Sequence, residues 1–123
     1  MILCLEYMHS KNIIYRDLKP ENIMVDRDGI MYLIDLGTAE ILQGRAFTMI
    51  GTPHYMAPEV YTGKWYSFLE DLWSLDVCMF EFINGGLPFG EDYDDPFEIY
   101  SCIMKGQLIF GYNVNKSSKD FIK

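Results

Sequence analysis

Basic residues are scarce in this sequence, and their scarcity excludes one broad class of partner. The 123 residues include 10 Lys and Arg against 18 Asp and Glu, which leaves a net charge of −8 with neutral histidines. A protein that binds nucleic acid neutralises a row of phosphates with a basic surface, and this sequence offers none. We therefore expect no nucleic-acid partner, whereas cationic partners suit the excess of acid.

Cysteines and long apolar runs are also few. Cys4, Cys78 and Cys102 are odd in number, lie far apart and form no C-x-x-C motif, which is typical of buried free thiols in a reducing compartment. The longest apolar stretch, residues 72–83, contains polar interruptions and has about 12 residues, whereas a membrane-spanning helix needs roughly 20. The first residues, MILCLEYMHSKN, lack the basic leader and cleavage site of a secretory signal. We expect a soluble, cytoplasmic protein without a membrane span.

Apolar residues, by contrast, are plentiful enough for one packed domain. Half of the residues are apolar and 15% are aromatic, which excludes intrinsic disorder as the main description. Residues 2–9 have helical apolar spacing without a preceding N-cap, so the chain begins inside a helix. At the other end, Ser117 or Ser118 would cap a helix through residues 120–122. Because both ends fall in helices, we expect a piece of a larger fold.

The middle of the sequence predicts a mainly α fold with a small β-hairpin. Residues 23–25 and 30–34 are short apolar runs on either side of Asp28-Gly29, a strong signal for a two-residue hairpin loop. A long loop without regular structure is expected over residues 37–56.

Helices are expected in the second half. Pro58 suits the first position of a short helix. Residues 67–84 are apolar on nearly every side and end at two glycines, which predicts a helix buried all round. Pro96 begins another helix. The apolar face of that helix would consist of Phe97, Tyr100, Ile103 and Met104.

The predicted hairpin brings two oxygen-bearing side chains together. With a two-residue loop at Asp28-Gly29, Asn22 would face Asp35 across the hairpin at about 5 Å. An amide oxygen and a carboxylate suit Mg²⁺, which takes one or two carboxylates together with substrate phosphates. Asp17 lies shortly before Asn22. Each acid alone is explained as well by a solvated loop, but their joint spacing favours a site.

Three ordered motifs resemble those of one family. Residues 15–22, YRDLKPEN, resemble the catalytic loop H-R-D-L-x-x-x-N of protein kinases with Tyr in place of His, residues 35–37 resemble D-F-G, and residues 57–59 match A-P-E. Residues 51–59, GTPHYMAPE, are similar to the cyclic-nucleotide-dependent (AGC) branch. Residues 86–90, followed by an acidic loop, are most similar to cGMP-dependent kinases of single-celled eukaryotes. The resemblance implies the C-terminal lobe of a protein-kinase-like fold.

The resemblance implies transfer of a phosphoryl group from ATP to a Ser or Thr hydroxyl, with ATP and Mg²⁺ as cofactors. Asp17 would accept the proton of the substrate hydroxyl, and Lys19 would balance the transferring charge, as in serine/threonine kinases. Asn22 and Asp35 would hold the magnesium ions. Met24 would lie under the adenine, although a methionine in a strand is more often part of a core. Lys19, Asn22, Asp35 and Met24 would thus face ATP.

The resemblance also implies contacts to a peptide substrate. Glu21 and Glu81 would bind an arginine shortly before the phosphorylated residue, although a Lys or Arg of this chain explains Glu81 nearly as well. Thr52 would hydrogen-bond Asp17 and Lys19, and the alternative for Thr52 is an ordinary turn residue. The apolar pocket for the residue after the phosphosite would consist of Met49, Pro53 and Met56.

The resemblance also implies a regulatory phosphosite and residues with structural roles. Thr48 lies between the D-L-G and A-P-E motifs, where the family is phosphorylated, and Arg16 would face its phosphate. Glu40 replaces a basic residue of similar kinases and would repel that phosphate. Alternatively, Thr48 is unmodified and Glu40 pairs with Arg45 or another surface cation. Asp71 would cap the long helix and anchor the catalytic loop. The structural roles are those of Arg16, Leu36, Gly37, Glu59 and Asp71.

The sequence lacks the Gly-rich phosphate loop, the strand lysine and the helix glutamate that complete an ATP site. We therefore interpret residues 1–123 as a partial protein kinase domain, the C-terminal lobe without the N-terminal lobe and the last helices. It would come from a basophilic serine/threonine kinase and be inactive alone. The expected partners are peptides with basic residues near Ser or Thr, and a cyclic-nucleotide-binding regulatory segment in a full-length protein.

The alternative from another class is a noncatalytic, pseudokinase-like binding module. Glu40 and Asp76, which replaces a helix glycine, favour that alternative. A metal-dependent phosphohydrolase is a remote third possibility, because the sequence lacks a second carboxylate cluster for two metals.

Overall fold

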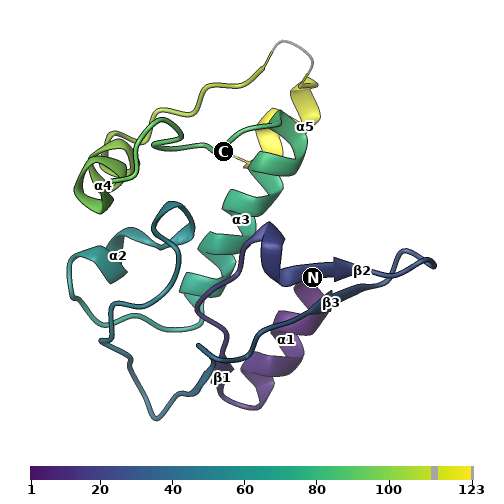
Figure 1. Cartoon of the computed structure of the whole chain (residues 1–123), viewed down its shortest axis with the longest axis vertical. Coiled ribbons are helices and arrows are strands. Elements are labelled where there is room, and N and C mark those ends of the chain that lie inside the picture. Colours follow the sequence, from purple (N-terminus) through teal and green to yellow (C-terminus); the bar gives the residue numbers. More distant parts are fainter. Residues whose placement is uncertain (112–113, 123) are drawn as a thin grey trace.

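The computed structural model describes residues 1–111 and 114–122. Its helices are α1 (Ile2–Ser10), α2 (Pro58–Tyr61), α3 (Leu69–Asn84), α4 (Pro96–Lys105) and α5 (Lys116–Ile122). Its strands are β1 (Ile13–Ile14), β2 (Ile23–Val25), β3 (Met31–Leu33) and β4 (Glu40–Ile41), and its 3₁₀ helices are η1 (Pro20–Asn22) and η2 (Pro53–Tyr55). The mainly α fold with a small β-hairpin agrees with the prediction (Figure 1).

Helix α3 is the element around which the others are arranged. Figure 1 shows it running through the middle of the molecule, with α1 and the β2–β3 hairpin on one side and α2 and α4 on the other. One core cluster joins α1 to α3 through Leu5, Met8 and Cys78. A second cluster gathers around the A-P-E segment. It includes Ile14, Leu42, Ala46, Met56, Ala57, Val60 and Tyr66.

The prediction that α3 is buried all round is wrong. Leu69, Leu72 and Ile83 are exposed, and they follow one stripe along the helix. The helix ends as predicted at Gly85, which adopts the left-handed conformation with φ 82°. Apolar composition alone does not distinguish a surrounded helix from one with an uncovered stripe.

The predicted apolar face of α4 is also wrong in part. Ile99 and Ile103 are buried, whereas Phe97 is 82% and Met104 is 61% exposed. The helix begins at Pro96 as predicted, after Asp95, whose carboxylate accepts a bond from the Phe97 N–H. Because α4 packs against η2 and α2, the pair four residues apart faces inward, and the flanking apolar residues face water.

The register of the hairpin differs by one residue from the predicted one. Ile23 pairs with Leu33 and Val25 with Met31, so the loop has residues 27–29 between Asp26 and Ile30, whose backbones are hydrogen-bonded. Gly29 has φ 81°, but Asp28 is not in the left-handed region that a two-residue loop would require of both residues. The Asp26 carboxylate accepts the N–H groups of Asp28 and Ile30, which stabilises the longer loop.

Residues 37–56 have more order than predicted. Strand β4 pairs with β1, with Ile13 opposite Ile41 and Ile14 opposite Glu40. Further along, Ala46 forms a two-way backbone bridge with Tyr66. The segment is therefore fixed at both places to the body of the molecule.

Two smaller predictions, the cap of the last helix and the burial of the cysteines, are also corrected. Helix α5 begins at Lys116, and Asn115, not Ser117 or Ser118, provides the side chain that accepts the Ser118 N–H. Cys78 is buried, but Cys4 and Cys102 are only half-buried; all are free thiols. Among the residues that the structure describes, no helix has both the length and the hydropathy to cross a bilayer.

Candidate active site

One carboxylate of α3 binds the backbone of the loop of residues 15–22. Asp71 is fully buried and accepts the backbone N–H groups of Tyr15 and Arg16, both at 2.9 Å. His9 of α1 donates its Nε2–H to the same carboxylate at 2.8 Å. Arg16 has φ 70°, a strained conformation that persists only where the surroundings determine it. Asp71 does not cap α3 as predicted, since the cap position is Phe68 and makes no side-chain bond.

The side chains of this loop converge on the Asp17 carboxylate. Lys19 Nζ lies 3.0 Å from Asp17 Oδ2 and donates to Thr52 Oγ1 at 2.7 Å. The Thr52 hydroxyl in turn donates to Asp17 Oδ1 at 2.7 Å. Asn22 Nδ2 donates to the backbone carbonyl of Asp17 at 2.8 Å and to its Oδ2 at 3.1 Å. Thr52 is thus a bridge between two loop side chains and not an isolated turn residue.

Asp35 lies at the end of the hairpin, one residue beyond the position that faces Asn22. The Ile34 N–H donates to the Asn22 carbonyl at 3.0 Å, so the predicted direct pairing of Asn22 with Asp35 is wrong. Asp35 has φ 58° and is exposed, and its Oδ1 accepts the Gly37 N–H at 3.1 Å. Leu36 of the same motif is also exposed.

The Tyr15 side chain connects the loop of residues 15–22 to the end of the hairpin. Its hydroxyl donates to the Ile34 carbonyl. Burial, together with the nearby carboxylates of Asp17 and Asp35, raises the pKa of Tyr15 to about 12. Both carboxylates therefore lie around one tyrosine, although they come from different segments.

The donor set suits a magnesium ion with its nucleotide phosphates. Asn22 uses its Nδ2 group for Asp17, and its Oδ1 accepts no bond from the residues that the structure describes. Asp35 Oδ2 is likewise without a partner in that part of the chain. Hard oxygen donors in this number fit Mg²⁺, which keeps several waters or phosphate oxygens. Within the described residues, no cluster of three His, Cys, Asp or Glu offers an all-protein metal cage.

The predicted acidic pair meets a hydroxyl instead of a cation of this chain. Tyr55 donates its hydroxyl to Glu81 Oε2 at 2.7 Å. Burial and this bond raise the pKa of Tyr55 far above its usual range, and Glu21 adds to the rise. Glu21 therefore lies near the same hydroxyl, and it is exposed. Glu81 has no ion pair among the described residues.

The predicted apolar pocket is not formed by all of its residues. Met49 is 56% exposed, whereas Met56 is 3% exposed and belongs to the second core cluster. Pro53 is half-buried, with an exposure between those of Met49 and Met56. A Cβ at Gly51 would lie 2.7 Å from the Arg16 carbonyl, so this glycine brings the segment close to the loop of residues 15–22. Met56 is a core residue, and only Met49 and Pro53 offer surface.

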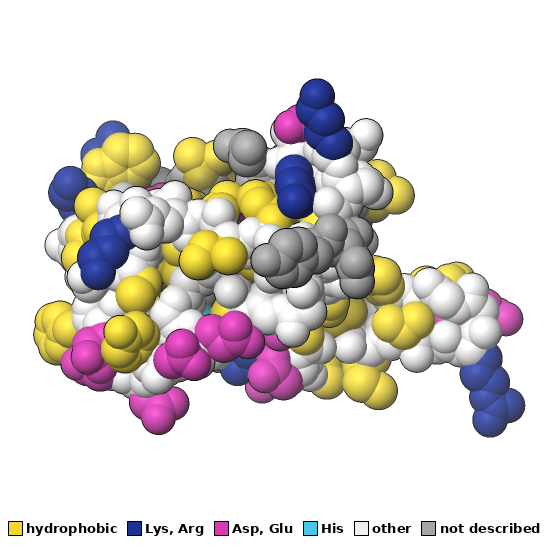
Figure 2. Space-filling model, turned by 90° about the horizontal axis from the view of Figure 1, so that it is seen from above, with side chains coloured by type: hydrophobic (Ala, Val, Ile, Leu, Met, Phe, Trp, Pro, Cys, Tyr) yellow, Lys and Arg dark blue, Asp and Glu magenta, His cyan; other side chains and the backbone are white. Residues whose placement is uncertain are grey.

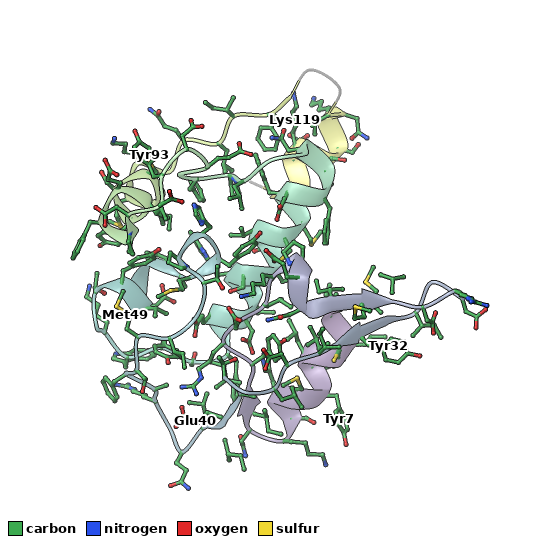
Figure 3. The ribbon with its side chains drawn as sticks, in the orientation of Figure 1. Tyr7, Tyr32, Glu40, Met49, Tyr93 and Lys119 are labelled. Atoms are coloured by element: carbon green, nitrogen blue, oxygen red, sulfur yellow. The ribbon has the colours of Figure 1, made fainter. Side chains whose placement is uncertain are left out.

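The Arg16 side chain already has an acidic partner. Its Nη1 forms an ion pair with Glu40 Oε2, and its Nε donates to the Thr38 carbonyl at 2.6 Å. Arg45 packs on the ring of Trp65 instead, at 4.0 Å from the centroid. The expected alternative, a pairing of Glu40 with Arg45, is therefore wrong. Figure 3 shows Glu40 beside β1.

Sequence reasoning missed one buried acid. Glu70 is 0% exposed, and both of its carboxylate oxygens lack a hydrogen-bond partner among the described residues. Burial raises the pKa of Glu70 to about 8, with a further contribution from Asp71. In the sequence, an acid in the first turn of a helix indicates only a favourable interaction with the helix dipole. Glu59 is half-buried and has no ion pair in the described part of the chain.

The Asp17 carboxylate is held by a lysine, a threonine and an asparagine, and the hairpin beside it ends in a second carboxylate. This arrangement is that of a protein-kinase-type fold. The protein kinase domain family matches residues 1–123, and the chain belongs to that family.

Known relatives narrow the similarity to one branch. The chain is 54% identical over 114 residues to a cGMP-dependent protein kinase of Eimeria tenella, covering 93% of this chain and 11% of that protein. It is 51% identical over 124 residues to that of Plasmodium berghei (strain Anka), covering 100% and 14%. It is 46% identical over 123 residues to the human cAMP-dependent protein kinase catalytic subunit PRKX, covering 100% and 34%. The predicted similarity to cyclic-nucleotide-dependent kinases is confirmed, and the chain spans only a minor part of each relative.

Proposed function

We propose that the chain is the C-terminal lobe of a serine/threonine protein kinase that transfers a phosphoryl group from Mg-ATP to a peptide hydroxyl. The observation that carries this proposal is the network in which Lys19, Asn22 and Thr52 all bond to the Asp17 carboxylate. Solvated loop acids are not fixed by partners from separate segments. Because phosphoryl transfer depends mainly on positioning and electrostatics, such fixing is what the reaction requires.

Asp17 is the proposed base. Thr52 occupies one lone pair of its Oδ1, while Lys19 and Asn22 bind its Oδ2. A carboxylate oxygen accepts two bonds, so Oδ1 retains a lone pair for the substrate hydroxyl. Asp17 would orient that hydroxyl and take its proton during transfer.

Lys19 is the proposed charge-balancing group. Its ammonium has three donors, of which two are directed to Asp17 and Thr52. The third is available to the anionic oxygens of the transferring phosphoryl group. Lys19 therefore joins the base and the phosphoryl group through one side chain.

Asn22 and Asp35 are the proposed metal-binding residues, with Met24 on the exposed hairpin under the adenine. Mg²⁺ and ATP would supply the neutralising charge and the phosphoryl group. Asn22 offers its Oδ1 and Asp35 its Oδ2, which accept no bond from the described residues. The bond from Gly37 to Asp35 Oδ1 fixes the direction of that carboxylate.

The proposed substrate is a peptide with basic residues before Ser or Thr. Glu81 uses Oε2 for Tyr55, and its Oε1 accepts no bond from the described residues. With the exposed Glu21 nearby, this offers two acids to a guanidinium, which binds carboxylates through several parallel bonds. Since the relatives are cGMP- or cAMP-dependent by name, we also propose a cyclic-nucleotide-binding segment elsewhere in the full-length protein.

The test is phosphotransfer by the full-length protein that contains this chain, with a radiolabelled γ-phosphate and an arginine-containing serine peptide. Asp17→Asn should lower kcat by roughly 10²- to 10⁴-fold, the usual scale for a positioned base. The matched control is Asp92→Asn, because Asp92 is exposed; this variant should keep the parental rate. Equal rates for Asp17→Asn and the parent would contradict the assignment.

The 123-residue chain alone should bind Mg-ATP weakly and transfer no phosphate to the peptide, because it lacks a phosphate-covering loop and its lysine. Turnover at roughly 1 to 100 per second by this chain would contradict that expectation. If the full-length protein binds Mg-ATP but transfers nothing, it is a noncatalytic binding module, the alternative that the pairing of Glu40 with Arg16 favours.

A further inference from the structure

Arg16 lies among acids from two directions. Glu40, on β4, pairs with its guanidinium from the segment of residues 37–56. Glu70, on α3, lies close enough for the positive charge of Arg16 to oppose the rise of the Glu70 pKa. Tyr66 is buried. Burial raises the pKa of its hydroxyl, the charges of Glu70 and Glu40 act in the same direction, and Arg16 opposes them.

This cluster is tied to the segment that contains Thr48. Tyr66 donates its hydroxyl to the Thr48 carbonyl at 2.6 Å, and its backbone N–H donates to the Ala46 carbonyl at 3.0 Å. The Leu42 N–H donates to the Asn12 carbonyl at 2.7 Å. The segment is thus fixed on both sides of Thr48 by contacts to the body of the molecule.

We propose that Glu40 is a positioning residue that serves as the built-in counter-ion of Arg16, with the buried acid Glu70 of α3 as a second acidic neighbour, so that the segment around Thr48 is held without phosphorylation. Only the comparison with a phosphate on Thr48 rests on the proposed function. The ion pair and the buried acid belong to the chain itself.

The two acids have different states in this arrangement. Glu40 is partly exposed and takes the Arg16 guanidinium, whereas buried Glu70 retains its proton at neutral pH. The charged and titratable groups around Glu70 are Asp71 on its own helix, Arg16 and Asp17 on the catalytic loop, Glu59 on α2, and Tyr66. Arg16 is the cation among them. Removal of Glu40 should therefore strengthen the electrostatic interaction of Arg16 with Glu70.

The experiment uses the 123-residue chain with Glu40→Gln, and Glu6→Gln as the matched control, because Glu6 is exposed on α1. Amide hydrogen exchange should become roughly three- to tenfold faster at Leu42 and Ala46 in Glu40→Gln, the scale of one partly buried ion pair. The amide of Ile99 in α4, which donates to the Asp95 carbonyl and lies far from the ion pair in sequence, is the internal reference. Glu6→Gln should leave all three amides unchanged.

A second readout follows the Glu70 carboxyl itself by carbon NMR during a pH titration. Its pKa should fall by about one pH unit in Glu40→Gln, because Arg16 no longer has a competing acid. A merely structural role of Glu40 would not move this titration. An unchanged Glu70 pKa, or unchanged exchange at Leu42 and Ala46, would overturn the proposal. Neither readout uses kinase activity, so failure of the proposed function would leave both results as they are.

Discussion

Replacing Glu70 by Gln should stabilise the chain at neutral pH. The folded protein holds the Glu70 proton up to a pKa of about 8, against an ordinary value of 4.5. Between these values the folded state binds more protons than the unfolded state, so stability falls as pH rises through this window. The decline is complete above the folded pKa. Gln has nearly the same shape and cannot ionise, so it removes this dependence.

The size of the effect follows from the same pKa difference. Each pH unit between the ordinary pKa and the working pH costs about 1.4 kcal/mol, so at pH 7 the penalty is about 3 kcal/mol. Near pH 5 it is below about 1 kcal/mol. Because a domain is stable by about 5 to 15 kcal/mol in total, Glu70→Gln should produce a large shift at neutral pH. The protonated acid and the amide are both unpartnered when buried, so their other contributions nearly cancel.

Urea unfolding at several pH values from about 5 to about 8 measures the prediction, with tryptophan fluorescence and circular dichroism as independent probes. The free energy of unfolding should rise with pH relative to the parent in Glu70→Gln. Glu6→Gln, at an exposed position of α1, should follow the parent within about 0.5 kcal/mol. A variant that is no more stable than the parent at pH 7, or one whose advantage is equal at all pH values, would refute the reasoning.

Three further changes test other contacts. Asp71→Ala should lower the free energy of unfolding by about 3 to 5 kcal/mol, because it leaves buried N–H groups of the catalytic loop without an acceptor; a loss below about 1 kcal/mol in urea unfolding would argue against the anchor. In the full-length protein, Asp35→Ala should abolish Mg-dependent nucleotide binding in calorimetry, and near-parental affinity would show that Asp35 is not a ligand. Glu40→Lys should increase the activation produced by phosphorylating Thr48, and Thr48→Ala should remove that increase; equal activity in both backgrounds would count against the phosphosite.

The sequence predicted the main helices, the hairpin and the loop of residues 15–22 because these depend on local spacing. Pro58, Pro96 and Gly85 mark helix ends by the dihedral angles they allow, and the structure has helix boundaries at these residues. The motif of residues 15–22 predicted which side chains gather around Asp17. Such patterns are short enough to be read from consecutive residues.

The failures concern contacts that no local pattern determines. The Asp26 carboxylate lengthened the hairpin loop, and a change of one residue there moved Asp35 away from the position opposite Asn22. The partner of Arg16 could not be chosen among several acids from charge alone, although it proved to be Glu40. Glu70 was missed because burial depends on what packs against a helix, which its own sequence does not state.

The arm formed by the β2–β3 hairpin affects how copies of the chain behave toward one another. Figure 2 shows it projecting from the body of the molecule with apolar side chains along it. Met24, Val25, Met31 and Tyr32 are all exposed there, on both faces of the arm. Contiguous apolar surface of this kind favours self-association.

The net charge of −8 opposes that association, since every copy repels the next. The repulsion reaches about 10 Å at 0.1 M salt and only about 3 Å at 1 M. Added salt would therefore weaken the repulsion while leaving the apolar arm unchanged. We therefore expect association of the chain through the hairpin arm to increase with ionic strength.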